Sequence, residues 1–271
     1  MEQPRVRKPA VAGQFYPDTA QALRKEIGSL ALKQVKKIDA IACMLPHAGY
    51  IYSGKVAAQT VSAVNIKEKI VLLGPNHTGY GAPYSIMVEG VWQTPLGQVK
   101  IDPVLAKKIL AGSKYLQADE QAHLYEHSLE VELPFLQYFN SSFEMVPIVF
   151  LSDDFPALQA VGREVAAALL DIKDKVMIVA SSDMTHYESQ SEASRKDHEA
   201  IKAILELDEE KLFQRVKSLK ISMCGYAPAI AMISAAKALG AKSAKLIKYQ
   251  TSGDVTGDME SVVGYAGVII Y

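Results

Sequence analysis

Four short motifs combine a side chain that can bind a metal ion with residues that form tight turns. The motifs are Pro46–Tyr50 (PHAGY), Gly74–His77 (GPNH), Ser181–His186 (SSDMTH) and Ser222–Tyr226 (SMCGY). Imidazole and thiolate are good ligands for iron, copper or zinc, and a carboxylate adds a harder oxygen ligand. Because these groups are scattered over about 180 residues, the pattern is unlike the paired ligands of a zinc ribbon or a zincin. The whole fold would have to bring them together.

The six histidines differ in their surroundings. His47, His77 and His186 belong to the motifs, while His127 precedes a predicted helix and is a candidate proton-transfer or substrate-binding residue. His198 lies in a charged helical stretch and is predicted to be on the surface, and for His123, in a polar connection, no role is predicted.

Each candidate also has an ordinary structural explanation. A histidine after a strand can be a hydrogen-bonded loop residue, and Cys224 can be a small buried apolar side chain. Asp183 can cap a helix that begins near Thr185. We interpret Cys43 as a core residue. Glu130 and Glu132 are predicted to be solvated on a helix.

Apolar runs of strand length alternate with segments of helical period, which indicates how the motifs are positioned. Strands are predicted at 41–45, 70–73, 145–150, 176–180, 246–249 and 262–271, and a hairpin pairs 84–88 with 99–101. Helices are predicted at 55–64, 103–111, 128–139, 156–170, 192–205, 208–218 and 226–239, with caps at Asp102, Ser128 and Gly240.

This alternation predicts a single α/β domain over residues 1–271, with a central, mostly parallel mixed sheet and helices on both faces. Ligands of such sheets bind outside the carboxyl ends of the strands. The first three motifs directly follow predicted strands, and the fourth directly precedes a helix. A common site at this edge of the sheet is therefore expected.

Composition excludes several classes of protein. The 271 residues carry 29 basic and 30 acidic side chains and are 49% hydrophobic, so we expect an ample core and no nucleic-acid partner. Two cysteines make no disulfide framework, which favours a cytoplasmic protein. No apolar run is long enough for a membrane span, and the first ten residues lack the apolar region of a signal peptide.

The motifs also identify a family. The sequence resembles the Memo family, known in prokaryotes as AmmeMemoRadiSam system protein B. The resemblance rests on stretches that span nearly the whole chain in order. These are 7–17 (RKPAVAGQFYP), 46–50, 74–77, 126–130 (EHSLE), 181–186, Cys224-Gly225, 254–258 (DVTGD) and 263–265 (VGY).

The resemblance implies a fold like that of the class III extradiol dioxygenases, which are non-haem iron enzymes. It implies that His47, His77 and Cys224 are the metal ligands. It also implies that Asp183 and His186 are further residues of the site, with His127 beside them. The related dioxygenases use two histidines and a carboxylate. Cys224 stands in the place of that carboxylate, which argues against ring cleavage and favours copper or a different iron chemistry.

Two hypotheses from different classes follow. In the first, the chain is a redox protein that binds Fe(II) or copper, with zinc as a third choice, and acts on a small-molecule substrate. His186 or His127 would then transfer protons and Asp183 would orient a histidine. The family name further suggests an oxidoreductase that works with a radical-SAM protein, and the dioxygenase likeness suggests a homo-oligomer. In the second, the same pocket is a non-catalytic binding module for a peptide or protein.

Overall fold

The computed structural model describes residues 5–271 and is organised around one mixed β-sheet. The strands are β1 (Val6–Arg7), β2 (Ala42–Leu45), β3 (Lys69–Pro75), β4 (Tyr84–Ile86), β5 (Val91–Thr94), β6 (Gly97–Ile101), β7 (Gln117–Ala118), β8 (Glu144–Phe150), β9 (Val176–Ser181), β10 (His186–Glu188), β11 (Ala244–Thr251) and β12 (Val262–Ile270). Their order in the sheet is β1-β5-β6-β8-β3-β9-β2-β12-β10. β11 pairs with β12, and β4 joins β8 to β7.

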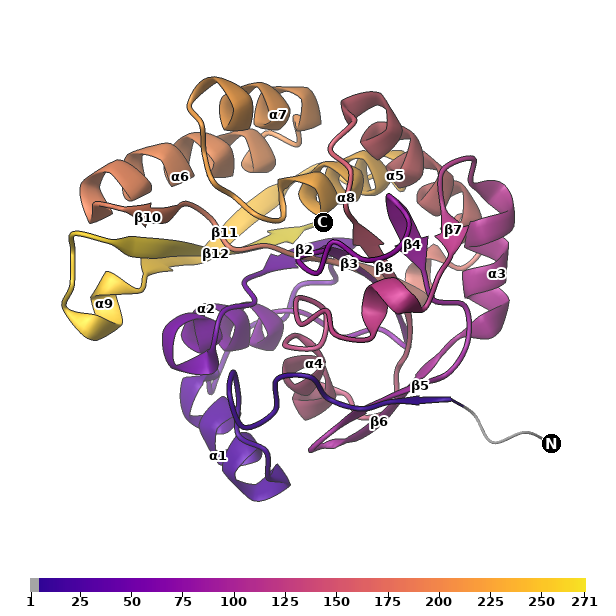
Figure 1. The fold of residues 1–271 in the computed structure, drawn as a ribbon, viewed down its shortest axis with the longest axis horizontal. Helices are drawn as coiled ribbons and strands as arrows, with labels where there is room; N and C mark the ends of the chain where they lie inside the picture. The colour runs from indigo at the N-terminus through magenta and orange to yellow at the C-terminus, as the bar shows by residue number, and fades with distance from the viewer. Residues whose placement is uncertain (1–4) are drawn as a thin grey trace.

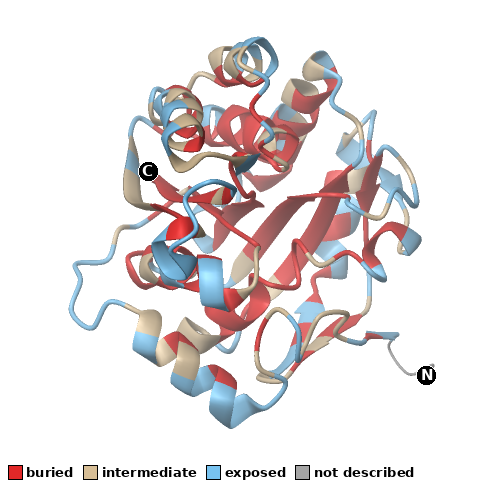
Figure 2. Ribbon diagram, turned by 60° about the vertical axis from the view of Figure 1, so that its left-hand side comes forward, coloured by how far each residue is buried: buried red, intermediate tan, exposed pale blue. Residues whose placement is uncertain are grey.

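The centre of the sheet consists of the parallel strands β8, β3, β9 and β2. Their side chains are buried on both faces, as in Ile70–Leu73 and Met177–Ala180, because helices cover both sides (Figure 2). The predicted α/β architecture with a largely parallel centre is confirmed. The strand predictions at 41–45, 70–73, 145–150 and 176–180 agree with the structure to within a few residues.

The helices form two layers, one on each side of the sheet (Figure 1). One layer contains α3 (Pro103–Gly112), α5 (Phe155–Leu169), α6 (Gln190–Leu205), α7 (Glu209–Ser218) and α8 (Tyr226–Ala238). The other contains α1 (Ala20–Leu30), α2 (Tyr50–Ser62) and α4 (Leu133–Phe139). Short turns complete the chain: α9 (Gly253–Thr256), η1 (Gln121–His123) and η2 (Lys173–Lys175).

Two of the three predicted helix caps are confirmed, one at the start of a helix and one at the end of another. Asp102 accepts hydrogen bonds from the N–H groups of Val104 and Leu105 at the start of α3. Gly240 follows the last turn of α8 with a φ of 100°, the left-handed conformation that favours glycine. These local signals therefore set the ends of two helices that pack over the sheet.

Two predictions about elements were wrong. Residues 128–132 are turns, and α4 begins only at Leu133, because Ser128 does not cap a helix and its hydroxyl instead donates to the Pro75 carbonyl. The hairpin near residue 90 pairs β5 with β6, while the 84–86 segment pairs with β8 and β7. The first strand of this hairpin is therefore β5 and not the predicted segment 84–88.

The prediction that Glu130 and Glu132 are solvated was also wrong, since both are fully buried. Glu130 forms an ion pair with Arg7 and accepts hydrogen bonds from the N–H groups of Ala10 and Val11. Arg7 also donates to the carbonyl of Glu126. These contacts tie the first strand to the loop that carries the EHSLE motif.

Within residues 5–271, none of the helices combines the length and the apolar character needed to cross a membrane.

Candidate metal centre

Three neighbouring strands end at one place on the sheet. β3, β9 and β2 lie side by side in that order, and Leu45 of β2 pairs with Ser181 of β9. His77 follows β3, Asp183 follows β9 and His47 follows β2. The carboxyl ends of three adjacent parallel strands therefore present the first three motifs together, as predicted from their positions.

Cys224 reaches the same place through a close backbone contact. A Cβ atom at Gly225 would lie 2.3 Å from the Ser181 carbonyl oxygen and 2.4 Å from the Ser182 Cβ. Only glycine allows the loop before α8 to approach β9 this closely. The Asp183 N–H lies 3.3 Å from the Cys224 sulfur, and this contact fixes the thiol at the strand end.

His47, His77 and Cys224 form a group whose ligand atoms all lie within 4.8 Å of one another. The Cys224 sulfur is 3.3 Å from the Nε2 atom of His47, and the His47 and His77 ring centres are 5.2 Å apart. His47 is buried, whereas about a third of the His77 side chain is exposed. These three side chains can hold a metal ion that remains open to solvent on the His77 side.

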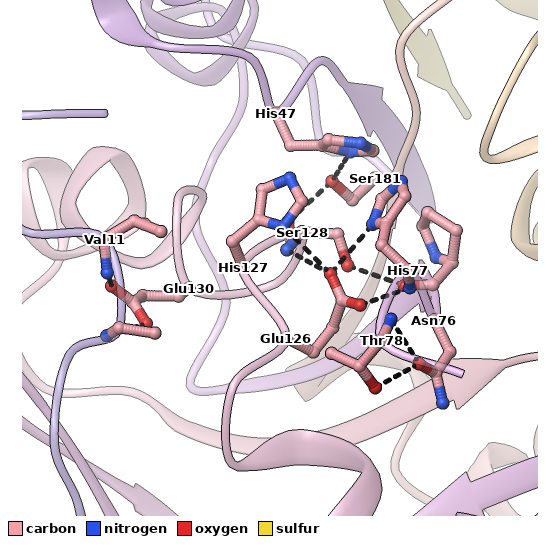
Figure 3. Close-up of polar contacts among 12 residues, drawn as sticks. Val11, His47, Asn76, His77, Thr78, Glu126, His127, Ser128, Glu130 and Ser181 are labelled. Carbon is pink, nitrogen blue, oxygen red and sulfur yellow. Dashed lines mark hydrogen bonds and ion pairs between the residues drawn. The ribbon is translucent and has the colours of Figure 1, made fainter. Parts of the chain in front are cut away.

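Each histidine of the group is fixed through its Nδ1 atom. His47 Nδ1 is 2.8 Å from the Ser181 hydroxyl, and His77 Nδ1 is 3.0 Å from a Glu126 carboxylate oxygen (Figure 3). When Nδ1 carries the proton and donates it in a hydrogen bond, Nε2 is unprotonated and keeps the lone pair that a metal requires. Since Nδ1 of each ring is engaged by a polar partner, Nε2 is the candidate metal-binding atom of each histidine.

Glu126 is a strong acceptor at the base of the site. Its carboxylate accepts hydrogen bonds from the backbone N–H and the ring of His77 and from the backbone N–H of Ser128. Burial opposes its ionisation, but these donors prevail and lower its pKa to about 2. Glu126, His77 and His127 also lie close enough to form a second potential ligand group. The Glu126 oxygens already accept hydrogen bonds from three N–H groups. We therefore interpret Glu126 as a residue that orients His77 and not as a metal ligand.

Burial keeps the His47 imidazole and the Cys224 thiol in their uncharged forms. Burial and the neighbouring imidazoles of His77 and His127 hold the pKa of His47 well below its ordinary value. The ring is therefore uncharged and can offer a nitrogen lone pair to a metal. Burial and the Asp183 charge raise the pKa of the Cys224 thiol. A metal ion would stabilise the thiolate and remove that penalty.

The other predicted site residues lie around this group. The His127 ring centre is 4.7 Å from that of His77 and 5.6 Å from that of His47 (Figure 3). Asp183 accepts a hydrogen bond of 2.8 Å from the His47 N–H, and burial raises its pKa to about 6 although His186 opposes this shift. The structure shows no helix at Thr185 for Asp183 to cap.

His186 is placed differently from the three ligand candidates. Its backbone N–H donates to the Ser222 hydroxyl and its Nδ1 lies 2.9 Å from the Ser222 carbonyl oxygen. The ring is thus attached to the loop that carries Cys224 and is not a member of the group of three. Among the residues of minor interest, His198 is exposed and Cys43 is buried, as predicted, while His123 is fully buried.

Three polar residues that support the site were not predicted from the sequence: Glu126, Ser181 as a partner of His47, and Glu132. Glu126 and Ser181 lie inside motifs that were recognised, so their proximity to His127 and Asp183 was an available signal. Nothing local distinguishes Glu132 from a solvated glutamate in an amphipathic segment.

The fold and the site together define an α/β protein with a histidine and cysteine group at the carboxyl edge of a mixed sheet. A family model described as "Memo-like protein" matches residues 7–269. A "MEMO1 family protein" from Methanococcoides burtonii is 46% identical over 98% of this chain and 100% of its own length. Another from Aquifex aeolicus is 45% identical over 98% of this chain and 99% of its own. The chain belongs to the Memo-like family.

One solved structure shows how far the fold extends beyond close relatives. An uncharacterized protein, JW3007, from Escherichia coli K12 superposes with a TM-score of 0.59 and 15% sequence identity. The match covers 84% of this chain and 98% of the other. At this identity the likeness concerns the fold alone.

Proposed function

We propose that this protein binds a redox-active transition metal, iron or copper, through His47 Nε2, His77 Nε2 and Cys224 Sγ. The observation that carries the proposal is the convergence of these three side chains, with both histidine Nδ1 atoms engaged by other partners. Three protein ligands with an exposed side are the arrangement of a reactive metal site, whereas a structural zinc site closes with four.

The donor set favours iron or copper over hard cations. Imidazole suits iron, copper and zinc, and a thiolate selects softer metals. A bound iron or copper ion would supply one-electron chemistry with dioxygen or a small-molecule substrate. Zinc fits the same ligands without redox chemistry and is the alternative that metal analysis must distinguish.

The chain's own residues would bind the metal, orient its ligands and hold protons. Ser181 and Glu126 orient the two imidazoles. Asp183 accepts a hydrogen bond from the His47 backbone N–H, and its own N–H lies beside the Cys224 sulfur, so its carboxyl group is a candidate for holding a proton at the site. The His127 ring is partly exposed and faces both ligand histidines, so it is the candidate for moving a proton to or from substrate.

Metal binding is tested on protein purified without oxygen and stripped of metal. Wild type should bind one equivalent of Fe(II) or Cu(I), and a His47→Ala/Cys224→Ala double variant should lose the site. His198→Ala, which removes an exposed histidine, should bind like wild type. Equal metal content in wild type and the double variant would contradict the ligand assignment.

A more specific proposal is that the chain is the metal-binding partner of a radical-SAM protein. Its support is the family to which the chain belongs. Affinity purification from the native host under anaerobic conditions should recover a radical-SAM protein with the wild-type chain. Its absence from repeated purifications would argue against this partnership and would leave metal binding unaffected.

Recognition of a phosphorylated peptide is less well supported by the geometry. Phosphate groups are bound best by arginine, yet Arg7 is buried and committed to Glu130 and to backbone carbonyls. Calorimetry with phosphopeptide and apo protein should therefore show no binding.

A further inference from the structure

The Ser181 hydroxyl has three polar neighbours and only one proton. Its oxygen lies 2.8 Å from His47 Nδ1, 2.8 Å from the Ser128 carbonyl oxygen and 2.7 Å from Glu132 Oε1. A hydroxyl donates one hydrogen bond and accepts up to two. The three contacts are therefore satisfied together only if one neighbour accepts and two donate.

The Ser128 carbonyl is the neighbour that must accept. A carbonyl oxygen has no proton to give, and within residues 5–271 the Ser181 hydroxyl is the only donor recorded for this oxygen. A buried carbonyl left without a donor would cost about 1–3 kcal/mol. The Ser181 hydroxyl consequently donates its hydrogen bond to the Ser128 carbonyl. Both His47 and Glu132 must then donate to the Ser181 oxygen.

We propose that Glu132 is a neutral carboxylic acid that, through Ser181, holds His47 in the tautomer with its proton on Nδ1. Glu132 is then a positioning residue: it acts on the metal ligand through the serine and does not contact the metal. This role rests on the proposed function, since the fixed tautomer presents the lone pair of His47 Nε2 to the metal.

The surroundings of Glu132 agree with a neutral acid. Its side chain is fully buried, and its Oε2 atom has no hydrogen-bond partner among the described residues. A buried carboxylate with one oxygen unpartnered would be very costly. Of the titratable groups that interact with it, Asp183, Tyr50 and Cys43, none is a cation. Burial and the Asp183 charge raise its pKa, and the Ser181 contact opposes this only in part.

Infrared spectroscopy of the metal-free protein tests the protonation state directly. The difference spectrum between wild type and Glu132→Gln at neutral pH should contain a carboxylic-acid C=O band that shifts in D₂O. Glu89→Gln, at an exposed glutamate, should remove a carboxylate band instead. If Glu132→Gln also removes only carboxylate bands, Glu132 is ionised and the proposal is wrong.

A second variant keeps this test valid if Glu132→Gln folds poorly. Ser181→Ala removes the acceptor but leaves the acid in place, so the C=O band should move to the higher frequency of a free acid. An unchanged band in Ser181→Ala would show that Glu132 does not donate to Ser181.

The positioning role is measured as metal affinity. The side-chain amide of the Glu132→Gln variant keeps an N–H donor toward Ser181, so this variant should bind metal like wild type. Glu132→Leu removes the donor and should bind about 10- to 100-fold more weakly, as is usual when a group behind a metal ligand is lost. Equal affinity in Glu132→Leu would refute the positioning role. Failure of wild type to bind metal would refute the proposed function, and the infrared band would still decide the state of Glu132.

Discussion

At the scale of single residues, the candidate site is defined by the groups that lie behind its proposed metal ligands. Each of the two proposed ligand histidines has a hydrogen-bond partner at Nδ1, and the two partners differ in charge. Glu126 is an ionised carboxylate with a pKa of about 2, while Ser181 is a neutral hydroxyl. His77 should therefore be the more electron-rich ligand, because a carboxylate raises the basicity of the imidazole it holds.

Replacing Glu126 tests this difference. Glu126→Gln replaces one carboxylate oxygen by an NH₂ group that faces N–H donors of His77 or Ser128, so at least one of the three hydrogen bonds must be lost. We expect metal affinity to fall about 10- to 100-fold, measured by competition with a chelator. Glu210→Gln, at an exposed glutamate, should leave the affinity unchanged.

We expect buried His123 to make the stability of the fold depend on pH. It is fully buried, and burial together with the charge of Arg7 lowers its pKa from 6.5 to about 4. Between these values the unfolded chain binds the proton and the folded chain does not, so stability falls as the pH drops from 6.5 to 4. The full loss is on the order of 3 kcal/mol.

The variant His123→Phe keeps a ring against Trp92, whose centre is 6.0 Å away, and removes the titration. Urea unfolding near neutral pH and again at a pH just above the lowered pKa should show a smaller acid loss in His123→Phe than in wild type. An identical loss in both proteins would assign the acid sensitivity to other groups.

At the scale of elements, local pattern predicted the buried strands and most helices. Continuous apolar runs such as Ile70–Leu73 and caps such as Asp102 act within a few residues, so the sequence alone reveals them. The segment 128–132 failed because Ser128, Glu130 and Glu132 have partners far away in the chain. Tertiary hydrogen bonds prevailed over helical periodicity there.

The same distinction separates the predictable part of the site from the rest. His47, His77 and Asp183 follow three strands, so the sheet topology brings them together as soon as the strands are recognised. Glu132 is different, because its burial depends on a contact with Ser181, 49 positions away. Periodicity alone gives such a glutamate a solvated position.

The packing of α2 on β12 leaves no room for a side chain at Gly267. A Cβ at Gly267 would lie 1.9 Å from the Thr60 hydroxyl oxygen and 3.1 Å from its Cβ. Gly267→Ala should lower the free energy of unfolding by about 1–3 kcal/mol, as overpacked cores do. Adding Thr60→Ala should recover much of that loss, and a double-mutant cycle in urea measures the coupling. Additive effects would mean that the two positions do not compete for space.

At the scale of the whole molecule, the N-terminal strand supports the site from a distance. Arg7 pairs with Glu130 in the interior, stacks 4.1 Å from the Trp92 ring centre and donates to the Glu126 carbonyl. Arg7→Met leaves a buried carboxylate without its cation and should cost about 3–5 kcal/mol. Thermal unfolding measures this cost, and Arg5→Met, at an exposed arginine, is the matched control.

Metal binding should appear in global stability as well. A ligand that binds only the folded chain stabilises it by about 2.7 kcal/mol at a free concentration about 100 times its Kd. Wild type should therefore melt at a higher temperature with the preferred metal, and Cys224→Ala should show no such increase. A similar increase in the variant would place the stabilising metal elsewhere.

The distance along the chain between His47 and Cys224 bears on the order in which the protein is assembled. The two residues are 177 positions apart, so bringing them together in an unfolded chain costs about 4–5 kcal/mol of loop-closure entropy. Cys224 also leaves the ribosome well after His47, and β12, the neighbour of β2, follows later still. We therefore expect the sheet to fold before metal binds, whereas small zinc modules fold only when the metal binds. Metal would enter a chain that is already synthesised and folded, through the exposed side at His77.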